Sequence, residues 1–130
     1  MALTSAALSG LDVRLLVPKR SDSRLVTLAA RSYFDELLQA GVKIYEYGPR
    51  MLHSKALIID EELCIVGSAN CFRLNFEVVA LFRDRQLTRE LATLIACEIA
   101  DAEQVRDDRK RSLWRYRLPE AMARLTSPLL

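Results

Sequence analysis

The residues best suited to chemistry lie close together near the middle of the chain. His53, the only histidine among the 130 residues, is followed by Lys55 and Asp60 in the pattern H-x-K-x4-D. After six further residues comes Gly67-Ser68-Ala69-Asn70, in which Ser68 and Asn70 carry polar side chains. An imidazole nucleophile, an ammonium group and two hydrogen-bonding side chains together suit attack on an anionic phosphorus centre.

A hairpin would bring these groups to one end of a sheet. The apolar runs Lys55–Ile59 and Leu63–Val66 predict its two strands, with Asp60 ending the first and a tight return at 61–62. His53 and the lysine two positions later are predicted to point to the same face. The second strand is then predicted to deliver the serine and asparagine of the Gly-Ser-Ala-Asn stretch beside His53.

The rest of the chain predicts an α/β domain with a single mixed β-sheet flanked by helices. Short apolar or alternating runs indicate strands, and apolar residues spaced by three and four indicate helices, one of them closed by Gly41. The expected strands are Asp12–Val17, Val42–Tyr47 and Glu77–Phe82, and the expected helices are 3–10, 21–41, 84–105 and 120–125.

Composition limits the function classes. A chain of 130 residues is one domain or a piece of one, and its 19 basic and 17 acidic residues give a net charge of only +2, which does not favour a nucleic-acid binder. The longest apolar stretch, Leu91–Cys97, is far shorter than the ~20 residues of a membrane span, and no secretory signal is visible. Three cysteines without C-x-x-C spacing and a lone histidine favour reduced thiols and no metal site.

The H-x-K-x4-D and G-S-x-N pattern resembles the HKD motif of the phospholipase D superfamily. The segments "DVRLLVPKRSDSRLV", "MLHSKALIIDEELCIVGSAN" and "RLNFEVVALFRD" resemble the second half of bacterial cardiolipin synthases, as does the tail "LWRYRLPEAMARLTSPLL". The resemblance covers residues 11–130. It implies one phospholipase D-like half-domain that carries a single HKD motif.

The resemblance implies phosphatidyl transfer without a metal or other cofactor. The nucleophilic histidine of the family maps to His53, which would form a phosphohistidine intermediate. The motif lysine maps to Lys55, which would neutralise the non-bridging phosphate oxygens, and Asn70 would donate hydrogen bonds to the same oxygens.

The resemblance also assigns three supporting positions. Ser68 maps to a supporting hydroxyl, and Asp60 maps to the aspartate of the catalytic motif, with a mainly structural part. Glu77, in "NFE", maps to the acidic residue that accepts a hydrogen bond from the far nitrogen of His53 and fixes its tautomer.

One HKD motif is half of what the family's active site uses, because one histidine attacks while the other protonates the leaving alcohol. The expected partner is therefore a dimer mate, related by a two-fold axis, or a second HKD half. The expected substrate is an anionic phospholipid of the phosphatidylglycerol type. The expected location is peripheral, at the cytoplasmic side of the bacterial inner membrane, with no transmembrane segment in this chain.

Two alternatives stay open. The first is a small homodimeric HKD phosphodiesterase or nuclease, although the interspersed basic and acidic residues favour a lipid substrate over DNA. The second is a non-catalytic remnant of a cardiolipin synthase. It is favoured by the short segment Cys71–Arg73, which would displace Glu77 from His53, and by the shortened start of the half-domain.

Overall fold

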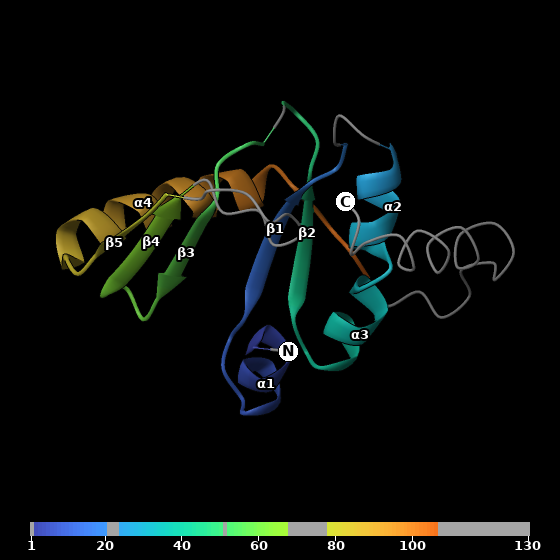
Figure 1. Cartoon of the computed structure of the whole chain (residues 1–130), viewed down its shortest axis with the longest axis horizontal. Coiled ribbons are helices and arrows are strands. Elements are labelled where there is room, and N and C mark those ends of the chain that lie inside the picture. The colour runs from blue at the N-terminus through green and yellow to red at the C-terminus, as the bar shows by residue number, and fades with distance from the viewer. Residues whose placement is uncertain (1, 21–23, 51, 68–77, 107–130) are drawn as a thin grey trace, which may run out of the picture.

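The computed structural model describes residues 2–20, 24–50, 52–67 and 78–106, and the described part of the chain mixes helices and strands (Figure 1). The predicted α/β class is thereby confirmed. In chain order the elements are α1 (Ala2–Leu8), β1 (Arg14–Pro18), α2 (Arg24–Arg31), α3 (Phe34–Gln39), β2 (Lys43–Tyr47), β3 (Ala56–Ile59), β4 (Leu63–Gly67), β5 (Val79–Phe82), α4 (Arg85–Ala100) and β6 (Glu103–Gln104).

The described strands form two three-stranded sheets, where the sequence predicts one mixed sheet. In the first sheet β2 lies between β1, which is parallel to it, and β6, which is antiparallel. The second sheet is the antiparallel meander β3-β4-β5. The chain leaves β2 through Gly48-Pro49, and proline cannot donate to a strand ladder. Within the described residues, no backbone pairing then joins β3 to a strand of the first sheet.

The core lies between the first sheet and the helices α2 and α3 (Figure 1). Val42 and Ile44 are buried while Lys43 between them is exposed, as the alternation of a strand requires. Both buried side chains pack against Phe34, the first residue of α3. Burying each stabilises the fold by about 1.5–3 kcal/mol relative to exposure. The partly buried residues around this cluster are Ala7, Val13, Leu15, Val17, Leu37, Leu38 and Val105.

A charge cluster holds the start of the parallel β1–β2 pair. Arg14 and Lys43 lie directly opposite each other, although like charges in that position repel. Asp12 pairs with both, at 2.7 Å from Arg14 Nη2 and 2.7 Å from Lys43 Nζ. These hydrogen bonds, chiefly the one from Arg14 and then the one from Lys43, lower the pKa of Asp12 to about 2.

The opposite charge arrangement occurs where β2 meets β6. Glu46 and Glu103 lie directly opposite each other, and each has its own cation. Arg31 at the end of α2 lies 2.7 Å from Glu46, and Lys19 after β1 lies 2.5 Å from Glu103. The hydrogen bond from Lys19 lowers the pKa of the Glu103 carboxyl below its ordinary value. Sheet and helix are thus joined by ion pairs that offset the repulsion between the two carboxylates.

Two helices differ from the sequence prediction. The helix expected over 21–41 is interrupted at Ser32-Tyr33, where the Tyr33 N–H bonds the carbonyl three residues back. Serine and tyrosine are weaker helix formers than the residues around them. The helix expected over 84–105 ends at Ala100, because the chain turns there into β6. The short helix expected at 120–125 lies outside the described residues.

Helix α4 supports one face of the second sheet. Its N-cap is Asp84, whose carboxylate accepts hydrogen bonds from the N–H groups of Gln86 and Leu87. Thr88 one turn later is fully buried and donates to the Asp84 carbonyl at 2.6 Å. Cys64 in β4 is buried as well, on the sheet face that α4 covers.

Candidate active site

The candidate site is at the open end of the β3–β4 hairpin. The N–H of Gly67 donates to the carbonyl of Lys55 at 3.1 Å, which extends the ladder one residue beyond the start of β3. Lys55 is half-buried, and His53 two residues earlier is exposed. Gly67 is the last described residue before the Ser68–Asn70 stretch, so the backbone leads into that stretch from a point beside Lys55.

The pairing register decides which face Lys55 shares. By strand alternation Lys55 lies on the same face as Leu57 and Ile59, whereas Ile58 lies on the face of Cys64. Since Cys64 is buried against α4, Lys55 faces away from that helix. The predicted reactive end of the hairpin therefore lies on the side of the sheet that α4 leaves open.

Gly67 is needed where β4 approaches β5. A β-carbon at this position would be 2.6 Å from the Val78 carbonyl oxygen and 3.0 Å from the Cα of Val79, which are backbone atoms. Contacts this short do not occur with a real side chain, so only glycine fits without movement. The glycine of the Gly-Ser-Ala-Asn stretch thus has a packing reason that the sequence did not reveal.

Asp60 lies at the other end of the hairpin, in its turn. Asp60 and Glu61 have φ values of 50° and 54°, and the Glu62 N–H bonds the Ile59 carbonyl at 3.1 Å. Positive φ at both central residues is the pattern of a type I′ turn. The turn is thus centred one residue earlier than the predicted 61–62. Five extended residues separate Asp60 from Lys55, or roughly 16 Å, so the structure does not bring Asp60 to the reactive end.

The turn is also tied to α4 by exposed ion pairs. Arg85 Nη2 pairs with Glu62, and Arg89 Nε lies 3.4 Å from Glu61. Such exposed pairs each contribute about 0–1 kcal/mol. Together with the turn geometry they give the end of the hairpin that holds Asp60 a structural part.

Three predicted site residues lie outside the described residues: Ser68, Asn70 and Glu77. Their predicted positions beside His53 stay predictions. Among the described residues, no three side chains of His, Cys, Asp or Glu come together as metal ligands, and Cys64 and Cys97 are free thiols. In the same part of the chain, no helix combines the length and apolar character needed to cross a bilayer.

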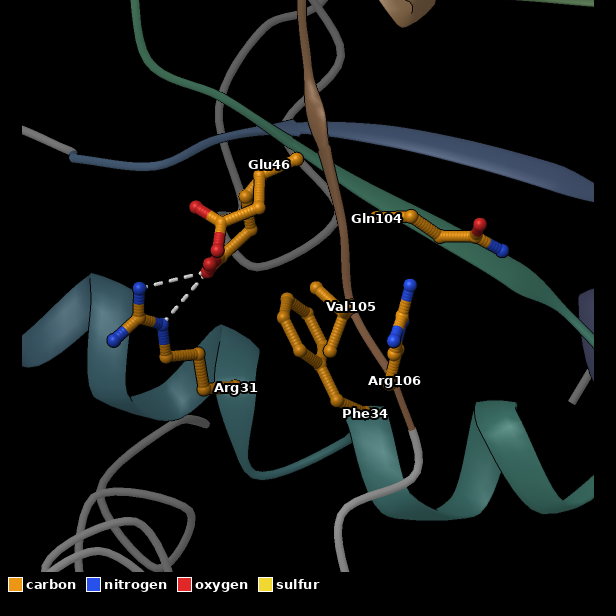
Figure 2. A pocket seen from close by; sticks show the side chains of 7 residues that line it. Arg31, Phe34, Glu46, Gln104, Val105 and Arg106 are labelled. Atoms are coloured by element: carbon orange, nitrogen blue, oxygen red, sulfur yellow. Dashed lines mark hydrogen bonds and ion pairs between the residues drawn. The ribbon is translucent and has the colours of Figure 1, made fainter.

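The structure also contains a cavity that the sequence analysis missed. It has a volume of about 580 Å³ and is lined by residues of α2, α3, β2 and β6 together with Val105 and Arg106 (Figure 2). Arg31 and Glu46 form an ion pair across its wall, and the Phe34 ring lies beside Val105 (Figure 2). None of the HKD residues lines this cavity. Its polar members come from elements far apart in the sequence, so spacing gives no signal for it.

Comparison with known proteins agrees with the HKD pattern. The family model described as "Cardiolipin synthase, PLD-like domain" matches residues 1–97. A cardiolipin synthase of Halalkalibacterium halodurans is 49% identical over 99% of this chain, and cardiolipin synthase 2 of Bacillus anthracis is 48% identical over the same share. Cardiolipin synthase A of Pseudomonas fluorescens is 40% identical. The chain spans only about a quarter of these relatives, at 27%, 26% and 28% of their lengths.

The fold has a counterpart among solved structures. The phospholipase D family member Nuc from Salmonella typhimurium superimposes with a TM-score of 0.72, covering 82% of this chain and 72% of Nuc. The two sequences are 19% identical, so this likeness concerns the fold alone. With a family model that matches most of its length, this chain belongs to the PLD-like domain family of the cardiolipin synthases.

Proposed function

We propose that this chain supplies one HKD half of a phosphatidyltransferase of the cardiolipin synthase type. The observation that carries the proposal is the hydrogen bond from the Gly67 N–H to the Lys55 carbonyl. It joins the His53–Lys55 end of β3 to the entry of the Ser68–Asn70 stretch. The similarity to cardiolipin synthases of three genera supports the same reaction class.

The proposed first step is attack by the His53 imidazole on the phosphorus of an anionic phospholipid such as phosphatidylglycerol. A P–N bond forms, the P–O bond to the headgroup glycerol breaks, and the glycerol oxygen takes a proton from a second histidine. Lys55 and Asn70 stabilise the negative charge on the non-bridging oxygens, and Ser68 supports them. No metal ion is required.

The proposed second step reverses these roles. The hydroxyl of an acceptor alcohol attacks phosphorus, its proton passes to the second histidine, and the P–N bond to His53 breaks. Glu77 holds the His53 ring in one tautomer through both steps. Asp60, in the turn at the far end of the hairpin, stabilises the fold of the motif and does not touch the substrate.

Because the chain has one histidine, the second one must come from elsewhere. We propose a dimer mate or a second HKD half, with peripheral contact to the cytoplasmic face of the bacterial inner membrane, where anionic phospholipid is available. In a two-fold dimer, the two copies of His53 share one site. One copy is then neutral when it attacks, while the other is protonated and serves as the acid.

The test of the chemistry is to trap the intermediate. The purified chain is incubated with phosphatidylglycerol labelled in its phosphate and then quenched in alkali, in which phosphohistidine persists. We expect label on the His53 peptide and a loss of phosphatidyl transfer of at least about 10³-fold in His53→Ala. The matched control is Ser54→Ala, an exposed neighbour with no assigned role, which should retain activity.

Mixing variants separates a shared site from independent sites. An equal mixture of wild type and His53→Ala should retain about one quarter of wild-type activity if both histidines of a dimer are needed. About one half indicates independent sites and contradicts the dimer. If neither label nor transfer is found even when a second HKD half is supplied, the chain is a non-catalytic remnant; turnover of a DNA diester without lipid transfer instead assigns it to the phosphodiesterases.

A further inference from the structure

The second sheet has an uncovered apolar face, on the side opposite to α4. By the pairing register the face comprises Leu57, Ile59, Leu63, Ile65, Val79 and Leu81. Four of these aliphatic side chains are 41–62% exposed. No charged side chain interrupts these six positions. Strands that are apolar on both faces are typical of sheets buried on both sides, but α4 covers only one of them.

The outer edge of β5 adds a second unmet requirement. No described strand pairs with that edge, so its outward backbone groups lack a ladder partner in the described part of the chain. Edge strands of isolated domains are usually protected by charges, proline or a bulge. The residues of β5, Val79–Phe82, are all apolar, and each is at least 42% exposed where it is a large side chain.

We infer that the uncovered face and the β5 edge form one docking surface for a strand–helix segment of polypeptide from outside these 130 residues. The strand would pair with the outer edge of β5 and continue the sheet, as in β-augmentation. The helix would lie with its apolar side on the uncovered face, as helices cover sheets in α/β domains.

Both features together select this occupant. A bilayer surface would cover the apolar face but leave the polar backbone groups of the β5 edge unpaired in an apolar medium. A second copy pairing β5 with β5 would satisfy the edge and leave both uncovered faces exposed. A strand joined to a helix satisfies the edge and the face at once.

The source of such a segment is also available. The matched cardiolipin synthases are about four times as long as the stretch that this chain covers, so their remaining polypeptide can supply a strand and a helix. The inference concerns packing and does not depend on the proposed chemistry. It also differs from the second HKD half, because it places a covering segment on the sheet of this same half-domain.

The test uses the full chain and overlapping peptides of about 35 residues, the size of a strand–helix unit, taken from the unmatched part of the Halalkalibacterium relative. Binding is followed by amide hydrogen exchange at 79–82 and by the melting temperature. We expect one peptide to slow exchange at 79–82 at least tenfold and to raise the melting temperature in proportion to its concentration.

Two leucines of equal exposure provide the matched pair of variants. Leu81 is 62% exposed on the proposed surface, and Leu94 is 64% exposed on α4. Leu81→Asp should weaken peptide binding at least tenfold, and Leu94→Asp should leave it within about twofold. Ile59→Lys, on another strand of the same face, is a second variant in case Leu81→Asp fails to fold; each variant is compared with wild type by circular dichroism.

Several results would overturn the inference. Protection of the 79–82 amides in the chain alone at high dilution would mean that its own residues cover the edge. Dimerisation that Leu81→Asp abolishes would make a second copy the occupant. Binding to phosphatidylglycerol vesicles that Leu81→Asp abolishes would make the bilayer the occupant, and failure of every peptide would remove the proposed segment.

Discussion

Gly67 lies so close to Val78 that a single added carbon would overlap the backbone, at 2.6 Å from the Val78 carbonyl oxygen. Gly67→Ala must therefore push β5 away from β4. We expect a loss of about 1–3 kcal/mol in the free energy of unfolding, as for other overpacked sites, measured by urea denaturation. Phosphatidyl transfer should fall as well, because the displaced strand end leads into Ser68 and Asn70.

Gly48→Ala is the matched control for this effect. A β-carbon on Gly48 would meet only the flexible side chain of Lys19, at 3.4 Å. We expect a change within about 0.5 kcal/mol. Equal destabilisation by the two alanines would contradict the close approach of β4 and β5.

Substitutions at Asp60 separate a turn residue from a catalytic one. Asp60→Asn and Asp60→Gly fit the positive φ of 50°, so we expect unchanged stability and transfer within about twofold of wild type. Asp60→Val should cost about 1–3 kcal/mol, because a β-branched residue is strained in that region. Thermal unfolding and the lipid assay measure both. A loss of transfer in Asp60→Asn as large as that in His53→Ala would place Asp60 in the reaction.

The Asp12 cluster predicts a change of stability in acid. Folding lowers the pKa of Asp12 from 3.8 to about 2, so its stabilisation is complete above the unfolded value and is lost as the pH falls through about 2. Asp12→Asn should therefore destabilise the protein at pH 6, and its difference from wild type should shrink between about pH 4 and pH 2. Urea midpoints across that range measure it. The difference should also shrink in 1 M salt, about 3 Å being the screening length there, and a salt-independent gap would contradict an ionic cause.

The N-cap of α4 predicts a further stability effect. The Asp84 carboxylate accepts from the N–H groups of Gln86 and Leu87 at 2.8 and 3.0 Å. Asp84→Ala should cost about 1 kcal/mol, whereas Asp84→Asn should retain most of the cap. Chemical denaturation followed by helical circular dichroism gives both values. If asparagine were as damaging as alanine, the charge and not the cap would be responsible.

Local patterns predicted the parts of the fold that depend on neighbouring residues. The β3–β4 hairpin follows from two apolar runs separated by a short polar turn, and the strand of alternating residues at Val42–Tyr47 is confirmed as β2. The two-residue strand β6 was missed, because Glu103-Gln104 carries no apolar alternation. The division into two sheets was also missed, since it depends on pairing between strands far apart in sequence.

The site was predicted to the same depth. Placing the Gly-Ser-Ala-Asn stretch beside Lys55 needed only a hairpin, and the described backbone agrees as far as Gly67. The distance from Asp60 to Lys55 was available in principle from the rise of a strand, but the motif alone groups the residues as if they were neighbours. The close contact of Gly67 and the cavity beside Arg31 arise from tertiary packing that no local spacing reports.

The two-residue turn at Asp60-Glu61 has one more consequence, for evolution at this locus. Adding or deleting a single codon in the turn would offset the pairing of β3 against β4 by one position. Every side chain of the shifted strand would then change sides, and the lysine would point toward α4. The hairpin loop is therefore intolerant of indels even though its surface is open to solvent, and natural length variants of this loop should lack the activity of their parents.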